Sequence, residues 1–291
     1  MGATVRTIVL FITLFLMFAL IGWVIGGYMF GNWVLGALIF IVFAGIFNLI
    51  SYFYSDRIVL WSYKAKIVKP HEAPKLNKIV HNICLKGDLP MPRLAIIDTQ
   101  TPNAFATGRN KKNAVVAATK GLLNMMSDDE LEGVLAHEMA HVKNRDILVM
   151  SIAATIAGAI SFAARIVWFH MLFGSRRQSQ GDMLLLIVVA VTVPIAAILI
   201  QVAISRNREY KADREGAIMI QRPLALASAL AKLEEANKRR PINRGNPASA
   251  SLFIVNPFRG GGFVRLFSTH PPVKERIRRL EKLSQEMGFV G

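Results

Sequence analysis

The chain has 291 residues, of which 53% are hydrophobic, and carries a formal net charge of +16 at pH 7. This hydrophobic share exceeds that of a typical soluble protein and lies in long runs, which excludes an ordinary soluble domain and indicates an integral membrane protein. The single cysteine, Cys84, excludes an intramolecular disulfide and fits a reducing compartment.

The basic residues gather in two polar segments. Of the 35 lysines and arginines, 14 lie between Arg57 and Arg145 and 17 lie between Arg206 and the C-terminus. Positive charge concentrated on one side of a membrane is typical of the cytoplasmic side, where it also meets anionic lipid headgroups. The basic residues are not interleaved with aromatic ones, as they are in nucleic-acid-binding modules. We therefore expect a lipid bilayer, and no nucleic acid, as the partner of this charge.

The first hydrophobic pair predicts a transmembrane helical hairpin in residues 1–56. Ile8–Tyr28 has 21 residues and Trp33–Tyr54 has 22, all uncharged, and about 20 helical residues cross the hydrocarbon core of a bilayer. The turn between the runs carries no basic residue, whereas Asp56-Arg57 and several lysines follow the second run. Both ends of the hairpin are therefore expected in the cytoplasm. The first run is longer than the apolar region of a typical signal peptide.

Residues 57–146 are interpreted as the first part of an α+β domain. Pro70–Leu85 has apolar residues at helical spacing and predicts an amphipathic helix. Arg93–Asp98 and Asn113–Thr119 have the composition of strands. Thr101–Gly108 would join them as a hairpin. An ordinary turn is the default interpretation of this segment, although a hairpin could also present an edge strand to an extended peptide.

The segment His137-Glu138-x-x-His141 predicts half of a zinc site. Residues i and i+4 of a helix share a face, so two imidazoles can approach one ion, and a neighbouring carboxylate can polarise water there. Ser127 and Glu130 have the spacing of a capping box, which favours a helix beginning just before the motif. Two surface histidines around a solvated glutamate are the alternative.

A second hydrophobic pair fills residues 147–205. Ile147–Ala164 and Met183–Ser205 are uncharged over 18 and 23 residues. We interpret them as a second hairpin that spans the membrane, although Pro194 lies inside the second run and Arg165 follows the first.

Residues 206–291 are interpreted as the second part of the domain and contain the candidate third ligand. Glu209 and Asp213 lie at positions i and i+4 of a predicted helix, where two carboxylates repel unless a cation lies between them. A surface helix with many ion pairs is the commoner explanation for such a pattern. Glu209 as a zinc ligand, with Asp213 bonded to a ligand histidine, explains the pair better. Residues 241–262 are rich in Gly, Pro, Asn and Ser and predict a loop over the site, and Pro272–Leu283 predicts a basic helix.

Taken together, these motifs resemble the HtpX heat-shock membrane proteases, relatives of the type I CAAX prenyl proteases. The resemblance rests on His137-Glu138-x-x-His141, the segment Ser205–Asp213, Asn103-Ala-Phe-Ala and Ser268-Thr-His270-Pro271, and it covers nearly the whole chain. It implies one zinc ion per chain, with His137, His141 and Glu209 as ligands.

The resemblance also assigns roles to residues outside the ligand set. It implies that Glu138 is the general base and acid, that His270 helps to stabilise the oxyanion, and that the stretch at Asn103, Ala104 and Phe105 holds the substrate backbone. From residue chemistry alone, His270 before two prolines is equally well a loop histidine.

The expected protein is therefore mainly helical α+β, with a zincin-like catalytic domain and transmembrane helical hairpins. It would be a multi-pass zinc endopeptidase of the inner (cytoplasmic) membrane with its catalytic domain in the cytoplasm. Its substrates would be misfolded or damaged membrane proteins or unfolded polypeptides, in protein quality control during stress. The rival is a membrane channel or transporter with a structural zinc ion. Cleavage at a prenylated C-terminus is disfavoured, since the CAAX relatives have more membrane spans.

Overall fold

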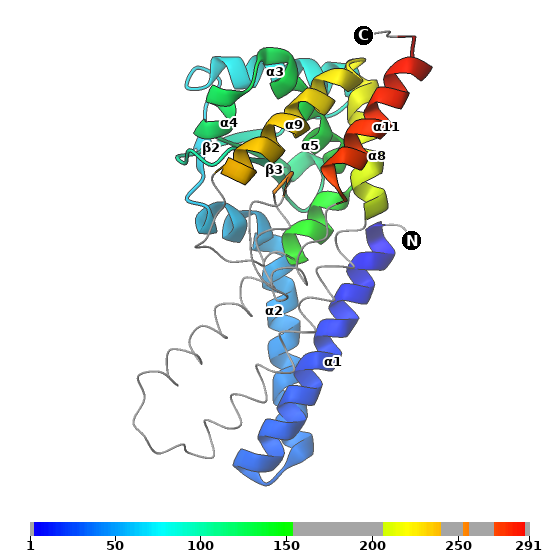
Figure 1. Ribbon diagram of the computed structural model, residues 1–291. Coiled ribbons are helices and arrows are strands. Elements are labelled where there is room, and N and C mark those ends of the chain that lie inside the picture. The colour runs from blue at the N-terminus through cyan, green and yellow to red at the C-terminus, as the bar shows by residue number, and fades with distance from the viewer. Residues whose placement is uncertain (1–2, 154–205, 240–252, 256–270, 289–291) are drawn as a thin grey trace.

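The computed structural model describes residues 3–153, 206–239, 253–255 and 271–288. Within them the protein is mainly helical, with one small sheet (Figure 1). Most of the second hydrophobic pair, from residue 154 to 205, lies outside the described residues. So do His270 and all of the expected loop 241–262 except residues 253–255.

Two long helices open the chain and pack against each other (Figure 1). They are α1 (Ala3–Phe30) and α2 (Trp33–Ser62). The turn between them uses Gly31 at φ 63°, and the Asn32 side chain caps α2 by accepting from Leu35 N at 3.0 Å. A Cβ at Gly36 would lie 2.3 Å from Gly26 Cα, so glycine allows the two backbones to touch.

Apolar side chains remain exposed along both of these helices. Val34, Val42 and Leu49 of α2, for example, are 60–67% exposed. By length and composition α2 is a candidate membrane span, with a mean hydropathy of 2.5 over its most apolar window. The helix runs to Ser62, eight residues beyond the predicted end of the hydrophobic run, so the expected boundary at residue 56 falls inside it.

A four-stranded sheet follows, in the order β1-β2-β4-β3. The strands are β1 (Lys66–Val68), β2 (Arg93–Ile97), β3 (Ala104–Thr107) and β4 (Val115–Thr119). Strands β2 and β4 were predicted, but they are parallel neighbours, and the turn expected between them contains β3, which pairs antiparallel with β4 at the edge. The ordinary-turn interpretation was therefore wrong, and the edge strand is confirmed. The sequence did not reveal β1, whose three residues are too few to show alternation.

Helices pack around this sheet and around one another (Figure 1). They are α3 (Pro74–Gly87), α4 (Lys120–Met125), α5 (Asp128–Lys143), α8 (Arg206–Ile220), α9 (Pro223–Arg239) and α11 (Val273–Glu286). The predicted start of α3 at Pro70 was wrong. Residues 70–72 form a turn, in which Glu72 Oε2 accepts from Lys69 N at 2.7 Å, and Pro74 is better placed in the first helical turn, where no N–H is needed.

Helix α5 is the central element, because it packs on β3, α3, α8 and α9. Every residue from Glu130 to Val142 is buried except Glu132. The capping box is confirmed, since Ser127 Oγ accepts from Glu130 N and Ser127 N donates to Glu130 Oε2. The histidine motif therefore lies on a buried, well-capped helix and not on a solvated one.

Candidate metal centre

The two motif histidines lie on the face of α5 that packs against α8. His137 is 1% exposed and His141 is 2% exposed, and their rings lie edge to face with centroids 4.8 Å apart. An imidazole without a partner is costly to bury, so two buried histidines on adjacent turns indicate a shared partner.

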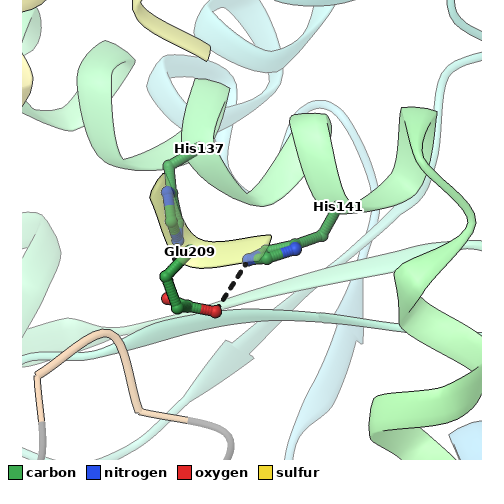
Figure 2. Close-up of side chains that lie close together, drawn as sticks. All are labelled: His137, His141 and Glu209. Carbon is green, nitrogen blue, oxygen red and sulfur yellow. Dashed lines mark ion pairs between the residues drawn. The ribbon is translucent and has the colours of Figure 1, made fainter. Parts of the chain in front are cut away.

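Glu209 of α8 faces both histidines (Figure 2). Its Oε2 lies 3.7 Å from His137 Nε2 and its Oε1 lies 3.5 Å from His141 Nε2. These separations are too long for hydrogen bonds. They match the edge of a tetrahedron whose corners are ~2.1 Å from a central ion, which is about 3.4 Å. The buried donor atoms, all within 4.8 Å of one another, therefore fit a single metal ion.

Close packing of α8 on α5 places Glu209 there. Glu209, Asp213 and Gly216 are spaced by four and three residues, so they share one face of α8. A Cβ at Gly216 would lie 2.8 Å from His137 N and 2.9 Å from Ala136 C and O. Only glycine lets the two helix backbones approach this closely without a shift at the ligand histidine.

Each histidine has a carboxylate behind it. Asp213 Oδ1 lies 2.9 Å from His137 Nδ1, although the ring is turned so that the N–H does not point straight at the oxygen. Asp146 Oδ2 lies 3.4 Å from His141 Nδ1. A carboxylate at Nδ1 favours the tautomer whose Nε2 lone pair is free for a metal. Asp213 was predicted for this position, and Asp146 was not.

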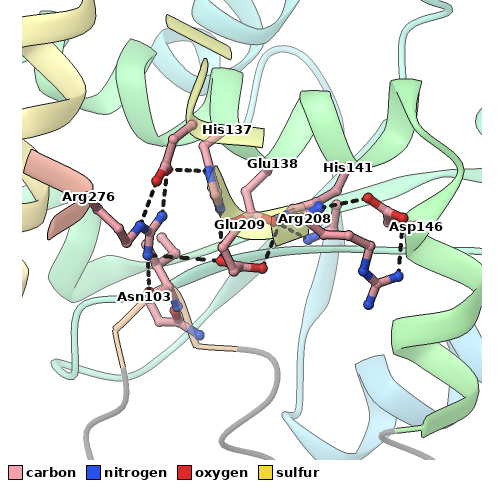
Figure 3. Close-up of polar contacts among 11 residues, drawn as sticks. Asn103, His137, Glu138, His141, Asp146, Arg208, Glu209 and Arg276 are labelled. Atoms are coloured by element: carbon pink, nitrogen blue, oxygen red, sulfur yellow. Dashed lines mark hydrogen bonds and ion pairs between the residues drawn. The ribbon is translucent and has the colours of Figure 1, made fainter. Parts of the chain in front are cut away.

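Each of these carboxylates is in turn paired with an arginine (Figure 3). Arg276 of α11, which is fully buried, donates from Nε to Asp213 Oδ2 at 2.8 Å and from Nη2 to Asp213 Oδ1 at 2.7 Å. Arg208, the neighbour of Glu209, donates from Nη1 to Asp146 Oδ1 at 3.1 Å. Sequence reasoning missed both arginines. The available signal for Arg276 was its place in the apolar stripe of α11 with Val273, Leu280 and Leu283.

The charges of this buried cluster balance around a divalent cation. Ionised Glu138, Glu209, Asp146 and Asp213 carry four negative charges, and Arg208 and Arg276 carry two positive ones. With neutral histidines the sum is −2, which a divalent ion would neutralise. Because buried charge is stable only when it is compensated, the donor set fits a divalent metal.

The pKa values of the surrounding carboxylates follow from these contacts. Burial acts to raise the pKa of Asp213, but the Arg276 guanidinium outweighs it and holds this pKa below its ordinary value. Burial likewise acts to raise the pKa of Asp146, but His141 and Arg208 hold it below its ordinary value. Both aspartates are therefore anionic at neutral pH.

Glu138 lies beside the donor group and is attached to the edge strand. Its Oε2 accepts from Ala106 N of β3 at 2.9 Å. Burial raises the pKa of its carboxyl, and Glu209 raises it further, while the two histidines lower it. A carboxylate whose pKa is raised is a stronger base than an ordinary glutamate, so in this position it can accept and return a proton.

The predicted substrate-binding residues lie at the start of β3. Asn103 O accepts from Thr119 N at 2.9 Å, Asn103 N donates to Thr119 Oγ1 at 2.9 Å, and Asn103 Oδ1 accepts from Ile254 N at 3.2 Å. Ala104 is buried, and the Phe105 ring packs on Tyr63 with centroids 5.1 Å apart. The side chain of Phe105 is thus part of the core packing, so only its main chain could contact a substrate.

A cavity of about 550 Å³ adjoins the segment before β3. Gln100, Thr101 and Pro102 line one side of it, and Lys232 and Arg239 of α9 line another. It contains none of the three metal-donor residues, so it is separate from the candidate centre.

Comparisons with known proteins agree with this geometry. The model of peptidase family M48 matches residues 70–284. A protein named Protease HtpX homolog from Thermococcus kodakarensis is 52% identical over 278 residues, which are 94% of this chain and 96% of that one. The homolog from Pyrococcus furiosus is 49% identical over 291 residues, 99% of each chain.

Among solved structures, that of Ste24p from S. mikatae is similar, with a TM-score of 0.50 and 19% sequence identity. The match covers 92% of this chain but only 62% of the longer Ste24p chain. At this identity the likeness concerns the fold alone.

Proposed function

Because the chain belongs to peptidase family M48 and is a membrane-associated metalloprotease, we propose that it is a zinc endopeptidase of the membrane. The observation that carries the proposal is the buried group of His137, His141 and Glu209, whose donor atoms lie within 4.8 Å of one another and could hold one metal ion. Two imidazoles and one carboxylate, with a fourth position left for water, are typical of catalytic rather than structural zinc. Zinc bound there would lower the pKa of water and polarise a scissile carbonyl.

Glu138 is the general base and acid of the proposed reaction. It takes a proton from the attacking water and returns it to the leaving amine. The hydrogen bond from Ala106 N to Oε2 fixes the direction of the carboxylate and leaves Oε1 for this transfer. A channel or transporter with a structural ion has no use for a buried base beside its metal, so this residue favours the hydrolase over the rival.

The outer residues keep the ligands in place. Asp213 and Asp146 orient His137 and His141, and Arg276 and Arg208 keep the two carboxylates anionic. The Nδ1 atoms then lie next to carboxylates and the Nε2 atoms face Glu209, which is the arrangement that a metal requires.

The substrate is proposed to bind as an extended strand beside β3. An edge strand offers main-chain groups to a peptide without regard to its sequence, as a protease for many damaged proteins requires. Asn103, Ala104 and Phe105 would supply these contacts. His270, which would assist at the oxyanion, lies outside the described residues.

The proposed domain plan divides one zincin-like catalytic domain into residues 57–146 and 206–291. The hairpins 1–56 and 147–205 would cross the bilayer, with the catalytic domain in the cytoplasm. The exposed apolar side chains of α1 and α2 support the first hairpin, since they would meet lipid. Placed next to the membrane, the enzyme would act on misfolded or damaged membrane proteins during stress.

The proposal is tested by cleavage in detergent. Protein purified with chelator should leave β-casein intact, and one equivalent of zinc should restore cleavage. Glu138→Ala purified in the same way is the control and should remain inactive with zinc. Equal cleavage by the chelated and zinc-loaded wild type would contradict a zinc mechanism.

A further inference from the structure

Residues 253–255 lie against the metal centre, and three side chains bind their main chain. Ile254 N donates to Asn103 Oδ1 at 3.2 Å, and Ile254 O accepts from Arg276 Nη1 at 2.8 Å. Val255 O accepts from Asn237 Nδ2 of α9 at 3.0 Å. These side chains therefore bind a peptide backbone through groups that every residue other than proline has.

Two side chains of this short segment are also buried. Phe253 is 8% exposed and Ile254 is 3% exposed. The Phe253 ring lies 6.4 Å from the Tyr63 ring, and the Tyr63 ring packs on Phe105 of β3. The segment thus occupies apolar contacts next to the edge strand as well as the polar contacts to its main chain.

The two residues that bind Ile254, Asn103 and Arg276, lie close to the candidate metal ligands and to Glu138. Arg276 is bonded to Asp213, and its Nη1 lies 3.9 Å from Glu209 Oε2. Asn103 precedes β3, whose Ala106 N–H binds Glu138. Figure 3 shows Asn103 and Arg276 together on the opposite side of Glu209 from Asp146. A peptide residue held by this pair therefore lies beside the candidate metal site.

Taking Asn103 and Arg276 as main-chain contacts of the substrate, we propose that Ile254 occupies their place in the resting enzyme. Residues 253–255 are then an autoinhibitory segment, which a substrate displaces in order to bind. Arg276 Nη1 donates to a substrate carbonyl in place of Ile254 O, and Asn103 Oδ1 accepts from a substrate N–H. The inference rests on the proposed function, because it assumes that the substrate backbone binds at Asn103.

Asn237 provides the means to test this occupancy. It binds Val255 O and, among the described residues, makes no hydrogen bond to the donor group or to Glu138, so Asn237→Ala weakens the attachment of the segment. The matched control is Lys238→Ala on the same helix, where an exposed Nζ pairs with Glu234. One neutral hydrogen bond changes an equilibrium by a factor of about 2 to 10.

The measurement is the Kd of fluorescein-labelled β-casein for the zinc-loaded, full-length Glu138→Gln protein in detergent, from fluorescence anisotropy. Adding Asn237→Ala should tighten binding by a factor of about 2 to 10, and adding Lys238→Ala should leave it unchanged. In the active protein, Asn237→Ala should lower KM by the same factor and preserve kcat. An unchanged or weaker affinity in the Asn237→Ala protein would overturn the proposal and mark the segment as a permanent part of the core.

Hydrogen exchange gives a second measurement that does not depend on a variant of the segment. Saturating β-casein should accelerate amide exchange at Ile254 of the Glu138→Gln protein, because displacement frees its N–H from Asn103. Exchange that is unchanged or slower would overturn the proposal. Cleavage of β-casein by the wild type tests the proposed function separately, so a wild type that cleaves while this amide stays protected would refute autoinhibition alone.

Discussion

Arg276 and Asp213 form a two-point ion pair in which the arginine is fully buried and the aspartate is 3% exposed. The pair joins α11, close to the C-terminus, to the helix that supplies Glu209. Through Asp213 it also reaches His137 Nδ1 at 2.9 Å. The last helix is thereby coupled to the candidate metal centre, although more than 130 residues separate Arg276 from His137.

Arg276→Lys should weaken zinc binding by roughly 10-fold or more, as changes behind a metal ligand do. Lysine keeps the charge but lacks the planar fork that binds both oxygens of Asp213. Chelator competition in detergent gives the affinity. Arg278→Lys is the control, since Arg278 lies on the same helix with its side chain 74% exposed. Equal zinc affinities of the Arg276→Lys and Arg278→Lys proteins would disprove the coupling.

Glu209→Ala should lower zinc affinity by more than the roughly 10- to 100-fold that is typical of changes behind the ligands. The two remaining histidines bind zinc more weakly than the complete set of three protein ligands. Asp146→Asn should give a smaller loss, because Asp146 only orients His141. The two variants are compared by zinc titration against one chelator. The reverse order of the two affinities would mean that Asp146, and not Glu209, binds the ion.

Gly216→Ala should lower both the melting temperature and the zinc affinity. Alanine is better than glycine in a helix by about 1 kcal/mol, but the added Cβ would meet the His137 backbone at 2.8 Å, and overpacking of this kind costs about 1–3 kcal/mol. Gly45→Ala is the control, since its Cβ would meet only the Phe15 ring at 4.0 Å. A melting temperature raised by Gly216→Ala would show that α8 does not rest on α5 as described.

Glu130→Gln should make the protein less sensitive to acid. Although burial acts to raise it, the pKa of Glu130 is held at about 2 by Lys232, Ser228 and the Ser127 backbone. A pKa depressed by folding contributes stability above the unfolded value near 4.3, and this stability is lost as the pH falls toward 2. Melting temperatures between pH 5 and pH 3 should therefore fall more steeply for the wild type than for Glu130→Gln. Parallel curves would contradict the lowered pKa of Glu130 and the contacts with Lys232 and Ser228 that cause it.

The sequence predicted the parts of the centre that lie within single helices. The i, i+4 spacing of His137 and His141 predicted two metal ligands on one helix. The same spacing of Glu209 and Asp213 predicted a third ligand and a carboxylate that contacts a ligand histidine. Contacts between different segments could not be predicted in the same way. The roles of Asp146, Arg208 and Arg276 depend on hydrogen bonds and ion pairs that only the tertiary fold forms. Strand β3 was predicted only as the alternative to an ordinary turn, for a different reason. All four of its residues are buried, so they lack the alternation that identifies a half-exposed strand.

The central claim is that His137, His141 and Glu209 hold a catalytic zinc ion on which Glu138 acts. Its most direct test is the zinc content and the activity of purified Glu138→Gln, measured on the same sample. The ligands are untouched and glutamine fits the space of glutamate, so one zinc per chain should remain while β-casein cleavage falls to background. Loss of zinc together with activity would make Glu138 part of the metal site, and cleavage at the wild-type rate would show that the base is another residue.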